Sequence, residues 1–141
     1  MSQQTAESNE ALIRSIVKNV GDNDFRLLME SLDEEVVWRS NAPSTLFRFG
    51  GVHRQRRGVQ EFLAQMACEY SFSRYAADTI VATAQEVWTA CNLEVRHQLS
   101  GRAGATRVAS HVTLKENKIV QYEGFFDTAS VLEQTGQLLA R

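Results

Sequence analysis

The sequence lacks long apolar runs, and it lacks an excess of positive charge. No stretch approaches the roughly 20 apolar residues of a membrane-spanning helix, and the polar segment 1–10 has no apolar signal-peptide core. We therefore expect a soluble, cytoplasmic protein with no membrane partner. Lysine and arginine number 15 against 17 aspartate and glutamate, a net charge of −2. Because general nucleic-acid binding needs a basic excess or stripe, we expect no nucleic-acid partner.

Cysteine is scarce, with only Cys68 and Cys91 in the chain. Neither has a second cysteine or a histidine at metal-ligand spacing, so we expect free thiols, no metal and no cofactor. The chain has one proline, Pro43, and no internal repeat or low-complexity segment. Its 43% hydrophobic and 23% charged residues are ordinary for a globular protein.

What is present is a regular series of apolar patterns along the chain. The length suits one domain, 1–141, and we expect residues 1–8 to form a flexible tail. Helices at the front of the chain and hairpins at the back predict an α+β class, with helices on one face of a curved antiparallel sheet. Periodicity predicts helices over 9–20, 25–32, 57–70 and 128–136, and strands over 36–40, 74–84, 86–99, 106–114 and 118–126.

The segment 34–43, EEVVWRSNAP, raises a specific question about function. In a strand, Trp38 and Ser40 lie on one side and Val37 and Arg39 on the other. The side with Trp38 is either packed core or one wall of a binding cavity.

Four stretches in order, 19–38, 50–66, 114–127 and 127–136, resemble the nuclear transport factor 2-like superfamily, in its SnoaL-like and ketosteroid-isomerase-like branch. The resemblance implies a cystatin-like, cone-shaped curved antiparallel sheet, with the helices against its concave face. It also implies a small hydrophobic ligand inside the cone and a homodimer through the convex face. The fold alone does not define the chemistry, because it hosts unrelated reactions.

The resemblance also implies which side chains form the pocket and which form the dimer. The third helix would contribute Phe62 and Met66, the first helix Arg14, and the loop before the third helix His53 and Phe49, with Phe47 as the alternative to Phe49. The strands would contribute Trp38, Ser40, Cys91, Leu93, Val108, Ser110, Tyr122 and Gly124. The convex face would present Trp88, Arg96, His111 and Phe125 to a second copy.

The catalytic groups of the known relatives are not retained. Ketosteroid isomerases use a carboxylate base, a tyrosine and a protonated aspartate, and these positions fall on Ser40, Arg14 and Ser110. Serine without a partner is no general base near neutral pH. The five positions that limonene-epoxide-hydrolase-like members need fall on Cys91, Leu93, Gly124, Trp38 and Ser40.

Three polar side chains remain as candidate catalytic groups. His53 could act as a base or ligand contact, or be a solvated loop residue. Arg14 could bind a ligand carboxylate, or extend to solvent from the helix edge. Tyr122 could donate a hydrogen bond to a ligand, or pack in the core with its hydroxyl satisfied.

Two functions therefore stay open. The first is a small-molecule-binding protein with an apolar pocket, either a pure binder or a lyase, isomerase or cyclase acting on a small hydrophobic, polyketide-like or steroid-like ligand. The second is a non-catalytic dimerisation or protein-interaction module, whose cone is filled by Phe47 and Phe49. An open cavity favours the first function and a filled cone favours the second.

Overall fold

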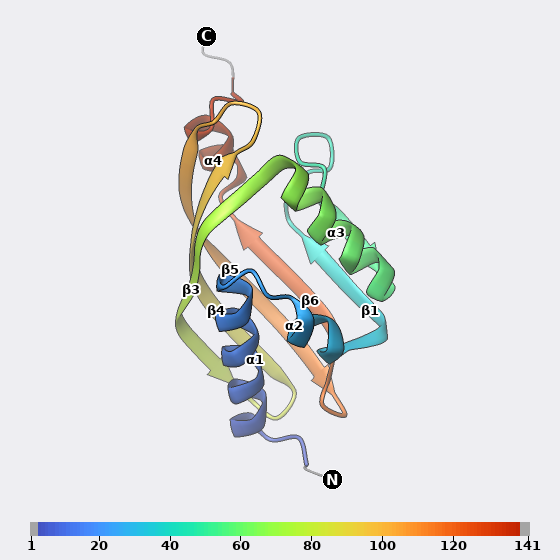
Figure 1. Ribbon diagram of the computed structural model, residues 1–141. Helices are drawn as coiled ribbons and strands as arrows, with labels where there is room; N and C mark the ends of the chain where they lie inside the picture. The colour runs from blue at the N-terminus through green and yellow to red at the C-terminus, as the bar shows by residue number, and fades with distance from the viewer. Residues whose placement is uncertain (1–2, 139–141) are drawn as a thin grey trace.

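Six strands and four helices make up residues 3–138, the part of the chain that this computed structural model describes (Figure 1). The helices are α1 (Ala6–Gly21), α2 (Arg26–Ser31), α3 (Gln55–Glu69) and α4 (Thr128–Gln134). The strands are β1 (Leu32–Ser40), β2 (Gly51–Arg54), β3 (Tyr70–Ala82), β4 (Glu86–His97), β5 (Ala103–Lys115) and β6 (Lys118–Phe126). The α+β class is confirmed.

The strands form one curved sheet in the order β2-β1-β6-β5-β4-β3. The sheet is antiparallel, as expected, at every neighbouring pair except β1 and β6, which run parallel. Parallel neighbours need a long crossover, and here the segment 41–117 supplies it. Register shifts in β3 and at Val120 in β6 mark bulges, and bulges bend strands and increase their twist.

Helices α1, α2 and α3 all lie on the same side of the sheet, which leaves the opposite side uncovered by them (Figure 1). Helix α1 packs mainly on β3, and α3 packs mainly on β1. The space between these helices and the sheet holds the hydrophobic core. The side chains on the inner face of β1, β4, β5 and β6 therefore lie in an enclosed, apolar environment.

The N-terminal helix begins at Ala6, three residues earlier than the apolar periodicity predicts. Thr5 caps it, because its side chain accepts from the Ser8 backbone while the Ser8 side chain accepts from the Thr5 backbone. The Gln4 side chain also donates to the Leu114 carbonyl at 3.1 Å. Residues 3–8 are therefore part of the fold rather than a flexible tail, and residues 1–2 lie outside the described range.

The connection between β1 and α3, residues 41–54, contains the short strand β2 and two buried rings. Phe47 and Phe49 are only 1% and 5% exposed, and Phe47 contacts the rings of Phe49 and Phe126 at centroid distances of 5.3 and 5.6 Å.

Among residues 3–138, no helix combines the length and the apolar character that crossing a membrane would require.

Candidate functional site

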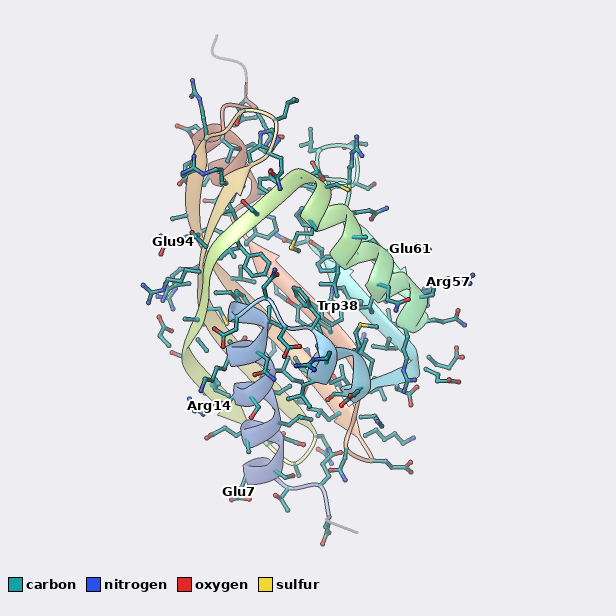
Figure 2. All side chains as sticks on the ribbon, viewed as in Figure 1. Glu7, Arg14, Trp38, Arg57, Glu61 and Glu94 are labelled. Atoms are coloured by element: carbon teal, nitrogen blue, oxygen red, sulfur yellow. The ribbon has the colours of Figure 1, made fainter. Side chains whose placement is uncertain are left out.

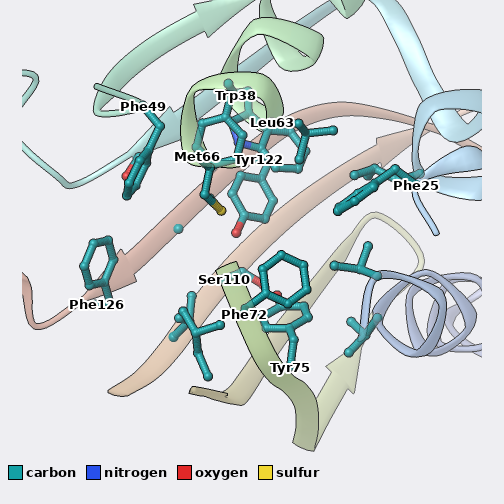
Figure 3. A pocket seen from close by; sticks show the side chains of 18 of the residues that line it. Phe25, Trp38, Phe49, Leu63, Met66, Phe72, Tyr75, Ser110, Tyr122 and Phe126 are labelled. Carbon is teal, nitrogen blue, oxygen red and sulfur yellow. The ribbon is translucent and has the colours of Figure 1, made fainter. Parts of the chain in front are cut away.

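A cavity of about 160 Å³ lies between the helices and the inner face of the sheet (Figure 3). Helix α1 contributes Ile13, Ile16, Val17 and Val20, whose spacing places them on one face of the helix. Ten of the side chains that the sequence predicts for a pocket lie in its wall: Trp38, Ser40, Phe49, Phe62, Met66, Leu93, Val108, Ser110, Tyr122 and Gly124. Strand β1 therefore presents the face with Trp38 and Ser40 to a cavity, which answers the question that the segment 34–43 raised.

Three of the predicted pocket residues do not line this cavity. Arg14 extends outward from α1 (Figure 2), where it pairs with Glu10 at 3.4 Å. The reason is helical phase: Arg14 follows Ile13, and one residue turns the side chain by about 100° away from the wall. Arg57, in the first turn of α3, also extends to solvent.

His53 and Cys91 lie close to the cavity but outside its wall. On β2, the His53 ring nitrogen Nε2 lies 2.7 Å from the Phe49 carbonyl oxygen, so this nitrogen is occupied. The Cys91 thiol is fully buried, and it donates to Thr89 Oγ1 at 3.8 Å. Burial raises the pKa of the Cys91 thiol, and a protonated thiol is a poor nucleophile.

The Trp38 side chain is the centre of the aromatic wall. Its ring stacks on Tyr122 at 3.8 Å with an interplanar angle of 14°, and it also contacts Phe62 at 5.5 Å. The stack follows from the parallel pairing, which places Trp38 directly opposite Tyr122. Trp38 is 5% exposed, and its indole Nε1 is buried without an acceptor in the described part of the chain.

Tyr122 brings a free hydroxyl group into the cavity. Figure 3 shows its Oη pointing into the open space, and no hydrogen bond joins it to any group of residues 3–138. Burial raises the pKa of the Tyr122 phenol, so the hydroxyl stays protonated and able to donate. The ring has room because Gly124 has no side chain: a Cβ there would lie 2.8 Å from Tyr122 Oη.

A second tyrosine, Tyr75 on β3, also lines the cavity, and sequence reasoning missed it. Its hydroxyl lies beside the Cys91 thiol, and burial raises the pKa of Tyr75 well above its ordinary value. The hydroxyls of Thr89 and Ser110 bond to each other. The polar group of Ser110 is therefore already satisfied within the protein.

Charged side chains do not line the cavity in the described part of the chain. The wall contains no aspartate, glutamate, histidine, lysine or arginine among those residues. Likewise, no group of three or more potential metal ligands occurs within residues 3–138. The arrangement offers an apolar container with hydrogen-bond donors, and it holds no general base of the kind that proton abstraction requires.

The outer face of the sheet carries the four residues expected at a dimer interface. Trp88 and Phe125 are 49% and 41% exposed. His111 stacks on Trp88 at 4.3 Å and bonds Glu86 Oε1 at 2.6 Å. The exposed Arg96 side chain donates to the Gly101 carbonyl at 2.5 Å.

Several solved structures have the same fold. An NTF2-like protein of unknown function from Burkholderia pseudomallei has a TM-score of 0.83 at 18% identity, covering 96% of this chain and 98% of that one. TerC, co-crystallised with polyporic acid, has a TM-score of 0.80 at 21% identity, covering 91% and 98%. An epoxide hydrolase from M. tuberculosis has a TM-score of 0.73 at 13% identity, covering 94% and 92%. At these identities the likeness shows the fold alone.

Sequence comparison gives a family as well as a fold. No protein of curated function matches this chain. The sequence profile of the SnoaL-like domain matches residues 13–122, which include the second half of α1, the helices α2 and α3, and most of the sheet. The chain therefore belongs to the SnoaL-like domain family, and it has the fold of the NTF2-like proteins.

Proposed function

We propose that this protein binds a small hydrophobic molecule in the cavity between its helices and its sheet. The observation that carries the proposal is an open cavity of about 160 Å³ with an almost entirely apolar and aromatic wall. Ligand sites are commonly concave and mostly apolar, with a few polar groups that orient the ligand. Here Phe47 and Phe49 are buried in the wall and leave this space open, which favours binding over an interaction module with a filled cone.

An isomerase-type reaction would have to differ from that of the ketosteroid isomerases. The three positions expected to carry their catalytic groups hold Ser40, Ser110 and the outward-facing Arg14. His53 is also outside the cavity. A lyase, isomerase or cyclase reaction would therefore rest on hydrogen-bond donation from Tyr122, which can polarise a carbonyl oxygen. We accordingly propose binding as the primary function.

Replacing Gly124 by alanine tests the binding proposal. The new methyl group would lie 2.8 Å from Tyr122 Oη, so the phenol ring must move into the cavity and occupy ligand space. We expect Gly124→Ala to weaken binding of a hydrophobic ligand by about tenfold, or about 1.4 kcal/mol. A thermal-shift screen of steroids, terpenoids, polyketide fragments and small aromatic compounds supplies the ligand, and calorimetry measures its affinity.

The matched control is Gly104→Ala on β5. A Cβ at Gly104 would meet its nearest atoms, on Gln134 and Thr135, at the ordinary distance of 3.4 Å, so this variant should bind as the wild type does. If no compound in the screen raises the melting temperature, or if both alanine variants bind alike, the cavity is not the binding site.

We also propose a homodimer through the outer face of the sheet. The support is the exposed apolar surface of Trp88 and Phe125 next to His111 and Arg96, because aromatic residues and arginine are enriched at interfaces. Native mass spectrometry should show a dimer that Trp88→Glu converts to a folded monomer. A wild-type protein that is monomeric at micromolar concentration would contradict this interface.

A further inference from the structure

We infer that the ligand is a neutral, single-ring molecule with a hydrogen-bond acceptor, which Tyr122 Oη engages. This inference rests on the proposed binding function and narrows it to one chemical class. Three properties of the cavity carry it: its size, the lack of charge in its described wall, and the unpartnered Tyr122 hydroxyl that points into it.

The size of the cavity limits the ligand to about one ring. Its volume is about 160 Å³. An apolar cavity of about 150 Å³ in another protein binds benzene, whereas drug-sized ligands occupy pockets of roughly 300–1,000 Å³. A four-ring steroid would fit only if the walls moved, so the volume argues against the steroid-like ligands that the family resemblance suggested.

The described wall argues for a neutral ligand. Moving a carboxylate or an ammonium group into apolar surroundings without an opposite charge is strongly unfavourable. None of the described lining side chains is charged. Arg14, the cation that the sequence suggested for binding a carboxylate, lies outside the cavity and pairs with Glu10. The aromatic rings could attract an ammonium group by cation–π contact, so that class must be tested directly.

The unpartnered polar atoms of the wall argue for an acceptor on the ligand. Tyr122 Oη has no hydrogen bond within residues 3–138, and Trp38 Nε1 on the ring stacked against it is buried without an acceptor there. A hydroxyl can donate or accept, and burial keeps the Tyr122 phenol protonated. An acceptor on the ligand is therefore the group that Tyr122 Oη, which points into the open space, can serve as a donor.

The other polar groups of the wall do not change this conclusion. Ser110 is bonded to Thr89, and the Tyr75 hydroxyl lies beside the Cys91 thiol. Ser40 Oγ accepts from the Ala42 backbone at 3.2 Å, and its hydroxyl hydrogen donates to no group of residues 3–138. A ligand acceptor is therefore also compatible with Ser40.

Calorimetric titration of the full chain with two matched probes tests this inference. Acetophenone and ethylbenzene have one ring each and nearly the same shape, but only acetophenone carries an acceptor. We expect acetophenone to bind about three- to tenfold more tightly, the usual net effect of one neutral hydrogen bond. Tyr122→Phe should abolish this preference without weakening ethylbenzene binding. Because the lost hydroxyl has no partner in residues 3–138, the variant should fold normally.

Tyr75→Phe is the matched control, because it also removes a phenolic hydroxyl from the wall. It should change the two affinities by the same factor, since that hydroxyl lies beside the buried Cys91 thiol. Equal binding of the two probes, or a preference that survives Tyr122→Phe, overturns the inference and leaves the binding function standing. Tighter binding of benzoate, phenyltrimethylammonium or a steroid ketone than of acetophenone overturns it as well. If none of these compounds binds, the proposed function itself is wrong.

Discussion

Raising the pH above about 10 should unfold this protein, and its three tyrosines should ionise in the same transition. Burial raises the pKa of Tyr70, Tyr75 and Tyr122 in the folded state, whereas a tyrosine in an unfolded chain titrates near 10. Below pH 10 both states keep the phenols neutral, and stability is fully present. Above it the unfolded state releases protons that the folded state retains, so stability falls.

The expected loss is large. Each of these buried phenols lowers the free energy of unfolding by about 1.4 kcal/mol for every pH unit above 10, until the pH reaches the pKa of that phenol in the folded state. Tyr75 and Tyr122 together thus remove roughly 3 kcal/mol per unit, a large fraction of the stability of a typical domain. Phenolate absorbance and far-UV circular dichroism, recorded together from pH 8 to 12.5, should change at the same pH.

Guanidinium-unfolded protein is the control, and its phenols should ionise near pH 10. The account fails if tyrosine absorbance in the native protein rises with a midpoint near 10 while the dichroism is unchanged. In that case the phenols would be open to bulk water, and the enclosed cavity that raises the pKa of Tyr122 would not exist in solution.

Replacing Phe47 by alanine should cost about 3–5 kcal/mol in the free energy of unfolding. This ring is 1% exposed, and it lies at centroid distances of 5.3, 5.6 and 6.3 Å from Phe49, Phe126 and Tyr70. Removing it leaves a hole beside the ligand cavity, between the loop and β6. Equilibrium denaturation in urea measures the change.

The neighbouring residue provides the control for Phe47. Leu46 is 52% exposed, so Leu46→Ala should change the free energy of unfolding by less than about 0.5 kcal/mol. Similar losses in the two variants would mean that the loop 41–50 is not packed against the sheet as the structure has it.

Much of the fold could be predicted from the sequence, because each helix and long strand has a clear apolar period. The parallel pairing of β1 with β6 could not be predicted, since partners more than 80 residues apart leave no local pattern. The cap at Thr5 was also missed: its partner is Ser8, and serine at that position is a weaker signal than glutamate or glutamine. Strand β2 is too short to show a period of its own.

The cavity wall was predictable wherever a strand keeps its alternation. Trp38 and Ser40 follow from β1, and Tyr122 and Gly124 follow from β6. Alternation gives the side on which a residue lies but not its depth, so Cys91 was placed in the wall although other atoms cover it.

Two errors at the site have definite physical causes. Tyr75 was missed because a register shift between Phe72 and Arg74 reverses the alternation of β3. Arg14 was placed in the pocket by comparison with isomerases. The apolar stripe of α1, with Ile13 and Val17 facing the cavity, predicts the opposite orientation for that side chain.

A crystal structure determined under xenon pressure tests the central claim most directly, that the cone encloses an open, apolar cavity. Xenon enters empty apolar cavities without needing any particular ligand chemistry. The account predicts a xenon atom in contact with the stacked Trp38 and Tyr122 side chains and with Phe72, inside the cavity of about 160 Å³. A cone with no xenon, filled instead by the rings of Phe47 and Phe49, would contradict it.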